Sequence, residues 1–190
     1  MSSKALVSVV FSTATLFAGE RMNISVCNLG AVPDKIVARA ESAVAAVFSP
    51  LQIEVSWSTC EELRPGVRVL LRLRRDSPID RAADDSAEIL GMAFTAAGVA
   101  GNMADAYYAA IERFARRHLA ESTEVLGYVV AHEIGHLLLG PGHCAGSIMA
   151  ASWNDKTLDA VRQRWLSFNQ SQRAAIHREL QARSLLAARR

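Results

Sequence analysis

The stretch VVAHEIGHLLLGPGHCAGSIMA, residues 129–150, carries three histidines and a glutamate in and just after an apolar run. His132 and His136 are four residues apart. On a helix, such side chains lie one turn apart and project within about 40° of each other. Two imidazoles placed in this way can bind one metal ion, and Glu133 beside the first of them can reach a water on that ion. The pattern therefore predicts a metal site on a helix.

The residues around this pattern are almost all apolar, which predicts a buried helix over residues 122–140. We expect Ser122 or Thr123 to cap its start and Gly140 to end it. Polar groups in such a helix cost free energy unless something compensates them, and a bound Zn²⁺ does so. In the alternative interpretation, backbone carbonyls satisfy both histidines and an arginine pairs with Glu133.

A third histidine follows the turn Gly140-Pro141-Gly142, which breaks the helix and reverses the chain. This turn would allow His143 to reach the same ion as a third ligand. Three protein nitrogens and one open position form the catalytic arrangement of zinc. A downstream carboxylate is the alternative third ligand, and Asp155 and Asp159 are the residues available here.

The segment HEIGHLLLGPGH, followed by SIM, resembles the metzincin clan of zinc metallopeptidases, whose pattern is H-E-x-x-H-x-x-G-x-x-H with a downstream Met-turn. The resemblance implies that His132, His136 and His143 bind zinc. It also implies that Glu133 is the general base and that Met149 is the methionine of the Met-turn. The His143-Cys144 pair is similar to the archaemetzincin subgroup.

The chain departs from the clan pattern at one place. Leu139 stands where the clan has glycine, and His143 comes one residue late. The connection before the third histidine therefore holds one extra residue, which the turn at Gly140 has to absorb.

Periodicity predicts an α+β fold. Alternating apolar residues indicate strands at 22–29, 51–57, 67–74 and 88–96, and helical spacing indicates helices at 32–48 and 169–189. The segment 102–118 is ambiguous, with a helical second half and a first half that fits the end of a strand. The resemblance implies a small, twisted, mostly parallel sheet of four or five strands packed on two helices, followed by the Met-turn and a C-terminal helix.

The length of 190 residues predicts one domain. The resemblance implies that this is a metallopeptidase-like domain over residues 20–190, with an upper part of about 20–140 and a lower part of about 141–190. Residues 1–19 have the layout of a secretory signal peptide. The alternative for this segment is a core strand, because Val7, Val9 and Phe11 alternate. If the segment is a signal peptide, we expect a secreted or periplasmic protein without a membrane partner once the signal is removed. If it is not a signal, we expect a cytoplasmic protein.

The formal net charge is only +2, and the sequence has no concentrated basic stripe of the kind that nucleic-acid binders carry. Nucleic acid is therefore not an expected partner. The chain has three cysteines, Cys27, Cys60 and Cys144. In an exported chain we expect one disulfide, and we assign it to Cys27 and Cys60.

Together these features predict a zinc-dependent endopeptidase that acts on a peptide or protein substrate. The clan resemblance implies an extended substrate along an edge strand, either 88–96 or 102–109. Two alternatives remain open, namely a zinc-binding protein without activity and a zinc amidase for small substrates.

Overall fold

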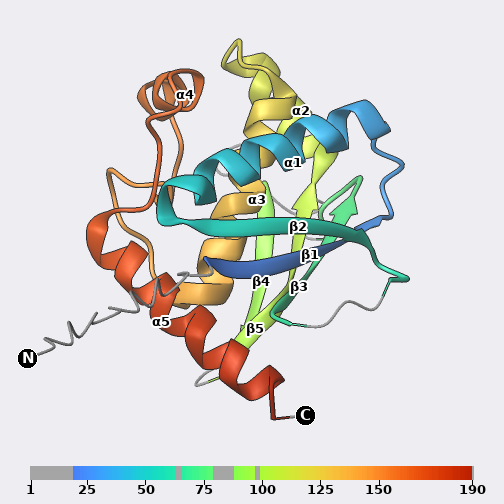
Figure 1. Ribbon diagram of the computed structural model, residues 1–190. Coiled ribbons are helices and arrows are strands. Elements are labelled where there is room, and N and C mark those ends of the chain that lie inside the picture. Colours follow the sequence, from blue (N-terminus) through green and yellow to red (C-terminus); the bar gives the residue numbers. More distant parts are fainter. Residues whose placement is uncertain (1–18, 63–65, 79–87, 97–98, 190) are drawn as a thin grey trace, which may run out of the picture.

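A computed structural model of the chain describes residues 19–62, 66–78, 88–96 and 99–189 (Figure 1). Within these residues the chain forms a five-stranded sheet in the order β2-β1-β3-β5-β4. Four strands run parallel and β4 runs antiparallel to β5. The strands are β1 (Glu20–Asn28), β2 (Ile53–Thr59), β3 (Arg68–Arg74), β4 (Gly91–Ala96) and β5 (Val99–Tyr107).

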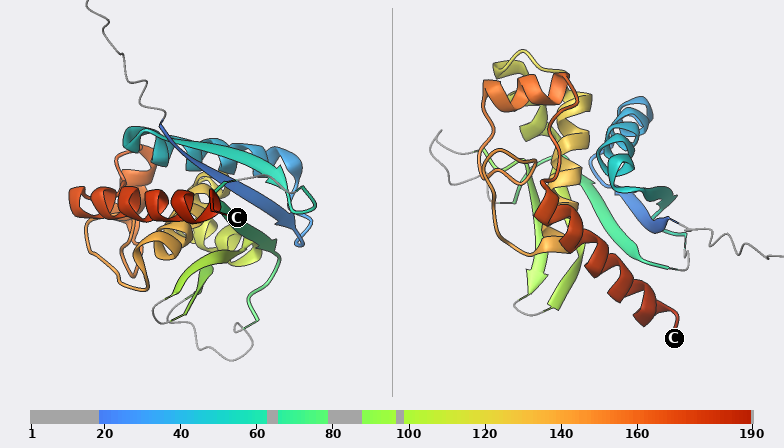
Figure 2. Two further views of the ribbon diagram at one scale, coloured as in Figure 1. Left: turned by 60° about the horizontal axis from the view of Figure 1, so that its bottom comes forward. Right: turned by 60° about the vertical axis from the view of Figure 1, so that its left-hand side comes forward.

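Two long helices cover one face of this sheet. The helices α1 and α3 pack against each other, α1 contacts β2, and α3 contacts β4 and β5 (Figure 1). The last helix, α5, packs against α3 and β1 (Figure 2). The described helices are α1 (Asp34–Phe48), α2 (Tyr108–Arg117), α3 (Ser122–Leu139), α4 (Asp155–Arg162) and α5 (Gln170–Ala187), with a short 3₁₀ turn at Ser49–Leu51.

The core lies between the sheet and these two helices. Its side chains come from alternate positions of the strands, because every second side chain points to the helices. In β1, Met22 and Ile24 are fully buried, and in β3 the inward residues Val69 and Leu71 are almost fully buried. The arginines of β3 lie on the opposite face, as the period of two requires. The predicted α+β class with a mostly parallel sheet is therefore confirmed, and so are the four predicted strands.

The structure resolves the ambiguous segment 102–118 into the end of β5 and the helix α2. It also adds α4, which the sequence interpretation missed. This short helix begins where the side chain of Asn154 accepts a hydrogen bond from the backbone N–H of Thr157, and it buries Leu158 and Val161. Eight residues give too few turns for a clear periodic signal.

The predicted cap of α3 is wrong. Extended backbone ends at Glu121, so Ser122 and Thr123 already lie in the first helical turn, and no described side chain caps it. Gly140 does end the helix, with a φ of 88°. That positive φ is accessible to glycine without the steric cost that a Cβ would add.

The predicted signal peptide, residues 1–19, lies outside the described residues except for Gly19, and β1 begins at the next residue. Among the described residues, no helix is both long and apolar enough to cross a membrane. All three cysteines lie in the described part of the chain and are free thiols, so the disulfide predicted between Cys27 and Cys60 is not formed in the structure.

Candidate metal centre

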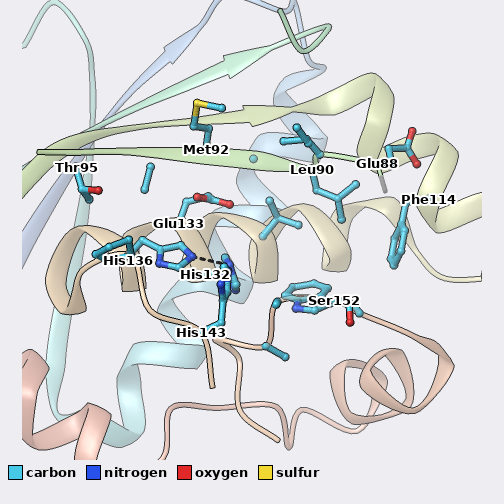
Figure 3. Close-up of a pocket in the computed structure, with 18 of the residues that line it drawn as sticks. Glu88, Leu90, Met92, Thr95, Phe114, His132, Glu133, His136, His143 and Ser152 are labelled. Atoms are coloured by element: carbon cyan, nitrogen blue, oxygen red, sulfur yellow. Dashed lines mark hydrogen bonds between the residues drawn. The ribbon is translucent and has the colours of Figure 1, made fainter. Parts of the chain in front are cut away.

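The helix α3 places the predicted site in a cleft of about 630 Å³. One wall of the cleft is α3, another is the edge strand β4 with the residues before it, and the third is the loop that follows α3. In Figure 3 the strand crosses above Glu133, and the three histidines converge below it. Most of α3 is apolar and buried, and its polar residues His132, Glu133 and His136 lie on the side that faces the cleft.

The structure brings the three predicted histidines together. Their ligand atoms all lie within 4.8 Å of one another, and this is the one such cluster among the described residues. The Nε2 atoms of His132 and His136 are 3.0 Å apart. A tetrahedral zinc ion with bonds of about 2.0–2.1 Å to nitrogen holds its ligands roughly 3.3 Å apart. The donor set therefore fits Zn²⁺, and the distance between the nitrogens of His132 and His136 is close to the one that the ion requires.

The carboxylates considered as alternative third ligands lie elsewhere. Asp155 accepts a hydrogen bond of 2.6 Å from Nδ1 of His118, and Asp159 pairs with Arg162 at 2.6 Å. The ring of His143, by contrast, lies 5.7 Å from that of His132 and 4.8 Å from that of His136, measured between centroids.

Backbone carbonyls orient the two helical histidines. Nδ1 of His132 donates to the carbonyl of Ile148 at 2.7 Å, and Nδ1 of His136 donates to that of Gly140 at 3.0 Å. A proton on Nδ1 leaves the lone pair of Nε2 free for a metal, and bonds of this kind are usual behind metal-binding histidines. The carbonyl contacts of the alternative interpretation do exist, but they use the atoms that face away from the cluster.

Burial keeps these imidazoles neutral. It lowers the pKa of His132 to about 4, with a further contribution from His136 and His143. Burial also lowers the pKa of His136. Neutral imidazole is the form that binds metal, so both rings are ready as ligands at neutral pH.

Glu133 lies under β4 and is 6% exposed. Burial raises its pKa to about 8, although the backbone of Ala93 donates a hydrogen bond that acts in the opposite direction. A Cβ on Gly91 would stand 2.7 Å from the Glu133 side chain, so the strand needs glycine there. Among the described residues no arginine acts on the pKa of this carboxyl. The arginine pair of the alternative interpretation is therefore not found in the described part of the chain.

Met149 packs directly beneath α3. It is fully buried, and a Cβ on Gly135 would lie 2.3 Å from its sulfur atom. The small residue between Glu133 and His136 therefore admits the methionine. Residues 141–143 are exposed, so the connection that holds the extra residue runs along the surface. A hydrogen bond of 2.7 Å from Cys144 N to the carbonyl of Met149 closes the turn that follows.

A hydrogen-bond network that the sequence interpretation missed joins this turn to α5. The hydroxyl of Ser147 donates to the carbonyl of Cys144 and accepts from Met149 N and from Nε2 of Gln172. Gln172 in turn accepts from the backbone of Asn169, within the capping box of α5. The cap spacing is visible in the sequence, but the contact between Ser147 and Gln172 spans 25 residues and has no local signal.

The remaining walls of the cleft are partly apolar. The indole of Trp153 stands edge-on to His132, with centroids 6.0 Å apart. Leu90 and Phe114 line one end of the cleft, and Thr95 lies at the other (Figure 3). Of the two strands considered for substrate, only β4 is at an edge, because β5 lies between β3 and β4.

No protein-family model and no curated protein matches the chain. Two solved structures are similar to it. An archaemetzincin from Methanopyrus kandleri shares 16% sequence identity, with a TM-score of 0.50 over 88% of this chain and 99% of the other. A zinc-dependent peptidase from Methanocorpusculum labreanum (strain Z) also shares 16%, with a TM-score of 0.51 over 82% and 99% of the two chains. The predicted metzincin-like fold, with its similarity to archaemetzincins, is thereby confirmed.

The Ser147–Gln172 contact supports the carbonyl that orients His132, so its loss should weaken metal binding. Gln172→Glu keeps the side-chain oxygen that accepts a hydrogen bond from the backbone of Asn169. It lacks the N–H group that donates a hydrogen bond to the hydroxyl of Ser147. At pH 8 we expect zinc to bind about 10-fold more weakly, a loss typical for groups behind a ligand. Competition with a chromophoric chelator measures this. Gln181→Glu, at an exposed position of the same helix, is the control, and equal affinities in the two variants would contradict the coupling.

The buried Glu133 should make the metal-free protein less stable as the pH rises. Its folded pKa of about 8 lies above the ordinary 4.5, so stability present at low pH is lost as the pH rises through 8. The pKa of His132 is shifted in the opposite direction, from 6.5 to about 4, and this shift changes the stability only below pH 6.5. Between pH 6.5 and 8 we expect the free energy of unfolding to fall by about 1–2 kcal/mol. Urea titrations measure it, and Glu133→Gln should abolish this fall.

Proposed function

We propose that the protein is a zinc-dependent endopeptidase. The observation that carries the proposal is the convergence of three histidine nitrogens within 4.8 Å, beside a buried carboxyl and in an open cleft. His132, His136 and His143 would hold the ion. When bound there, Zn²⁺ supplies a Lewis acid that lowers the pKa of water toward about 7 and stabilises negative charge on a carbonyl oxygen.

In this proposal Glu133 moves the protons of the reaction. Its carboxylate takes a proton from the attacking water and returns it to the nitrogen of the leaving amine. A cation beside the carboxyl favours its ionised form, which counteracts the effect of burial. The Ala93 N–H holds the carboxylate in place, and the carbonyl of Ile148 holds the ring of His132.

We also propose that the substrate is an extended peptide that pairs with β4. An edge strand presents unpaired backbone N–H and C=O groups along one side, which an extended chain can complete. β4 is such a strand, and it forms a wall of the cleft that holds the histidines. The apolar side chains at one end of this cleft favour a substrate with an apolar residue next to the cleaved bond. These side chains are Leu90, Phe114, Val129 and Trp153.

Replacement of Glu133 tests the catalytic role separately from the metal site. We expect Glu133→Gln to lower the rate of peptide cleavage by about 10²–10⁴-fold, the contribution typical of a general base. Zinc content should stay unchanged, because the amide leaves the three imidazoles in place. The measurement compares cleavage of a pooled peptide library by the zinc-loaded wild-type and variant proteins, with a chelator control.

Glu124→Gln, on the same helix, is the matched control and should keep wild-type activity. Unchanged cleavage by Glu133→Gln would refute the role of the carboxylate. Tight zinc binding by the wild-type protein without cleavage of any peptide would instead support a zinc-binding protein without activity. Hydrolysis of small amides alone would support a zinc amidase.

A further inference from the structure

We propose that Cys27 and Cys60 are a disulfide-forming pair, a redox modification site on the sheet face that points away from α1 and α3. The proposal concerns neither the metal nor the cleft, so it stands independently of the proposed peptidase activity. It rests on the pairing of two neighbouring strands and on the surroundings of the two thiols.

The register of β1 and β2 ends one pair before the two cysteines, so they follow each other side by side at the end of the paired strands. The strands pair in parallel, side by side in Figure 1, with Val26 facing Thr59, and the next residue on each chain is a cysteine. Opposed residues on adjacent strands have Cα atoms about 5 Å apart, within the range of about 4.4–6.8 Å that disulfides span. Cys60 is the first residue after β2, so its backbone is free of the strand pairing.

The surroundings of Cys27 do not suit a thiol that serves only as a small apolar residue. Val26 packs against the core, so Cys27 points to the other face, beside the polar residues Ser25 and Asn23. In β3 its register partner is Arg72. Both thiols of the pair are only partly buried, so a small disulfide reagent can reach them.

Cys144 has a different environment and serves as an internal contrast. It lies in the loop after α3, where its sulfur accepts a hydrogen bond of 3.3 Å from Nδ2 of Asn169. No strand register places it opposite another cysteine in the described residues. We therefore expect it to remain a thiol when the pair is oxidised.

The oxidant is a low-molecular-weight disulfide such as glutathione disulfide. Burial, the neighbouring Cys60 thiol and the Glu61 carboxylate raise the pKa of Cys27 to about 11, so its thiolate is scarce at neutral pH. Exchange begins at Cys60, which lies beyond the end of β2, and its thiolate attacks the reagent and releases one glutathione thiolate. Cys27 then displaces the second, so the S–S bond forms, the reagent takes two electrons, and the two thiol protons go to the released glutathiones.

The bond would close a loop that contains α1 and β2. A crosslink of this kind stabilises a protein mainly by restricting the unfolded chain. For a protein of this length we expect the midpoint of thermal unfolding to rise by about 5–15 °C on oxidation.

The test equilibrates the full chain with reduced and oxidised glutathione at pH 8, then blocks free thiols and maps peptides without reduction. We expect one disulfide between Cys27 and Cys60, a blocked Cys144, and the higher unfolding temperature. Cys144→Ser should give the same bond and the same shift. Cys60→Ser, changed beyond the end of β2, should give neither.

Three blocked cysteines after equilibration with oxidised glutathione would overturn the proposal, and so would a disulfide that includes Cys144. The Cys60→Ser variant keeps the test valid if a change at Cys27, inside β1, prevents folding. Because the readouts are thiol state and unfolding temperature, the result is separate from any result on peptide cleavage.

Discussion

The hydrogen bond from Nδ1 of His132 to the carbonyl of Ile148 joins the two parts of the chain that must meet for this site to exist. The histidine belongs to α3, which the sheet and α1 hold in place, whereas the carbonyl belongs to the turn that carries Met149. The side chain of Met149 packs against Gly135 of α3, and this packing also holds the turn against the helix. Because α5 supports the turn through Gln172 and Ser147, the orientation of one imidazole depends on three separate segments.

Local patterns predicted most of the fold, because each strand with one buried face repeats an apolar residue every second position. Val69 and Leu71 in β3 are examples. The boundary between β5 and α2 was not predictable in the same way, since Ala106 and Tyr107 suit either state and pairing with β3 decides it. The short α4 was missed because its signal is a single cap at Asn154.

The site was predictable to the extent that its residues are close in sequence. His132, Glu133 and His136 share one helix, and His143 follows after a turn, so their convergence needs little long-range information. The groups that orient them were not predictable. The carbonyls of Ile148 and Gly140, and the partner of Ser147 on α5, are set by how distant segments pack. The sequence motif thus identifies the candidate metal ligands, whereas the fold determines the orientation of their rings.

The most direct measurement of the central claim is zinc bound per chain, determined together with affinity for the wild-type protein and for His143→Ala. We predict about one tightly bound ion for the wild type, and an affinity lower by more than about 100-fold once one of three ligands is lost. His177→Ala, whose imidazole pairs with Glu20 far along the chain, should bind zinc like the wild type. Equal stoichiometry and affinity in His143→Ala would contradict a centre built from three converging histidines.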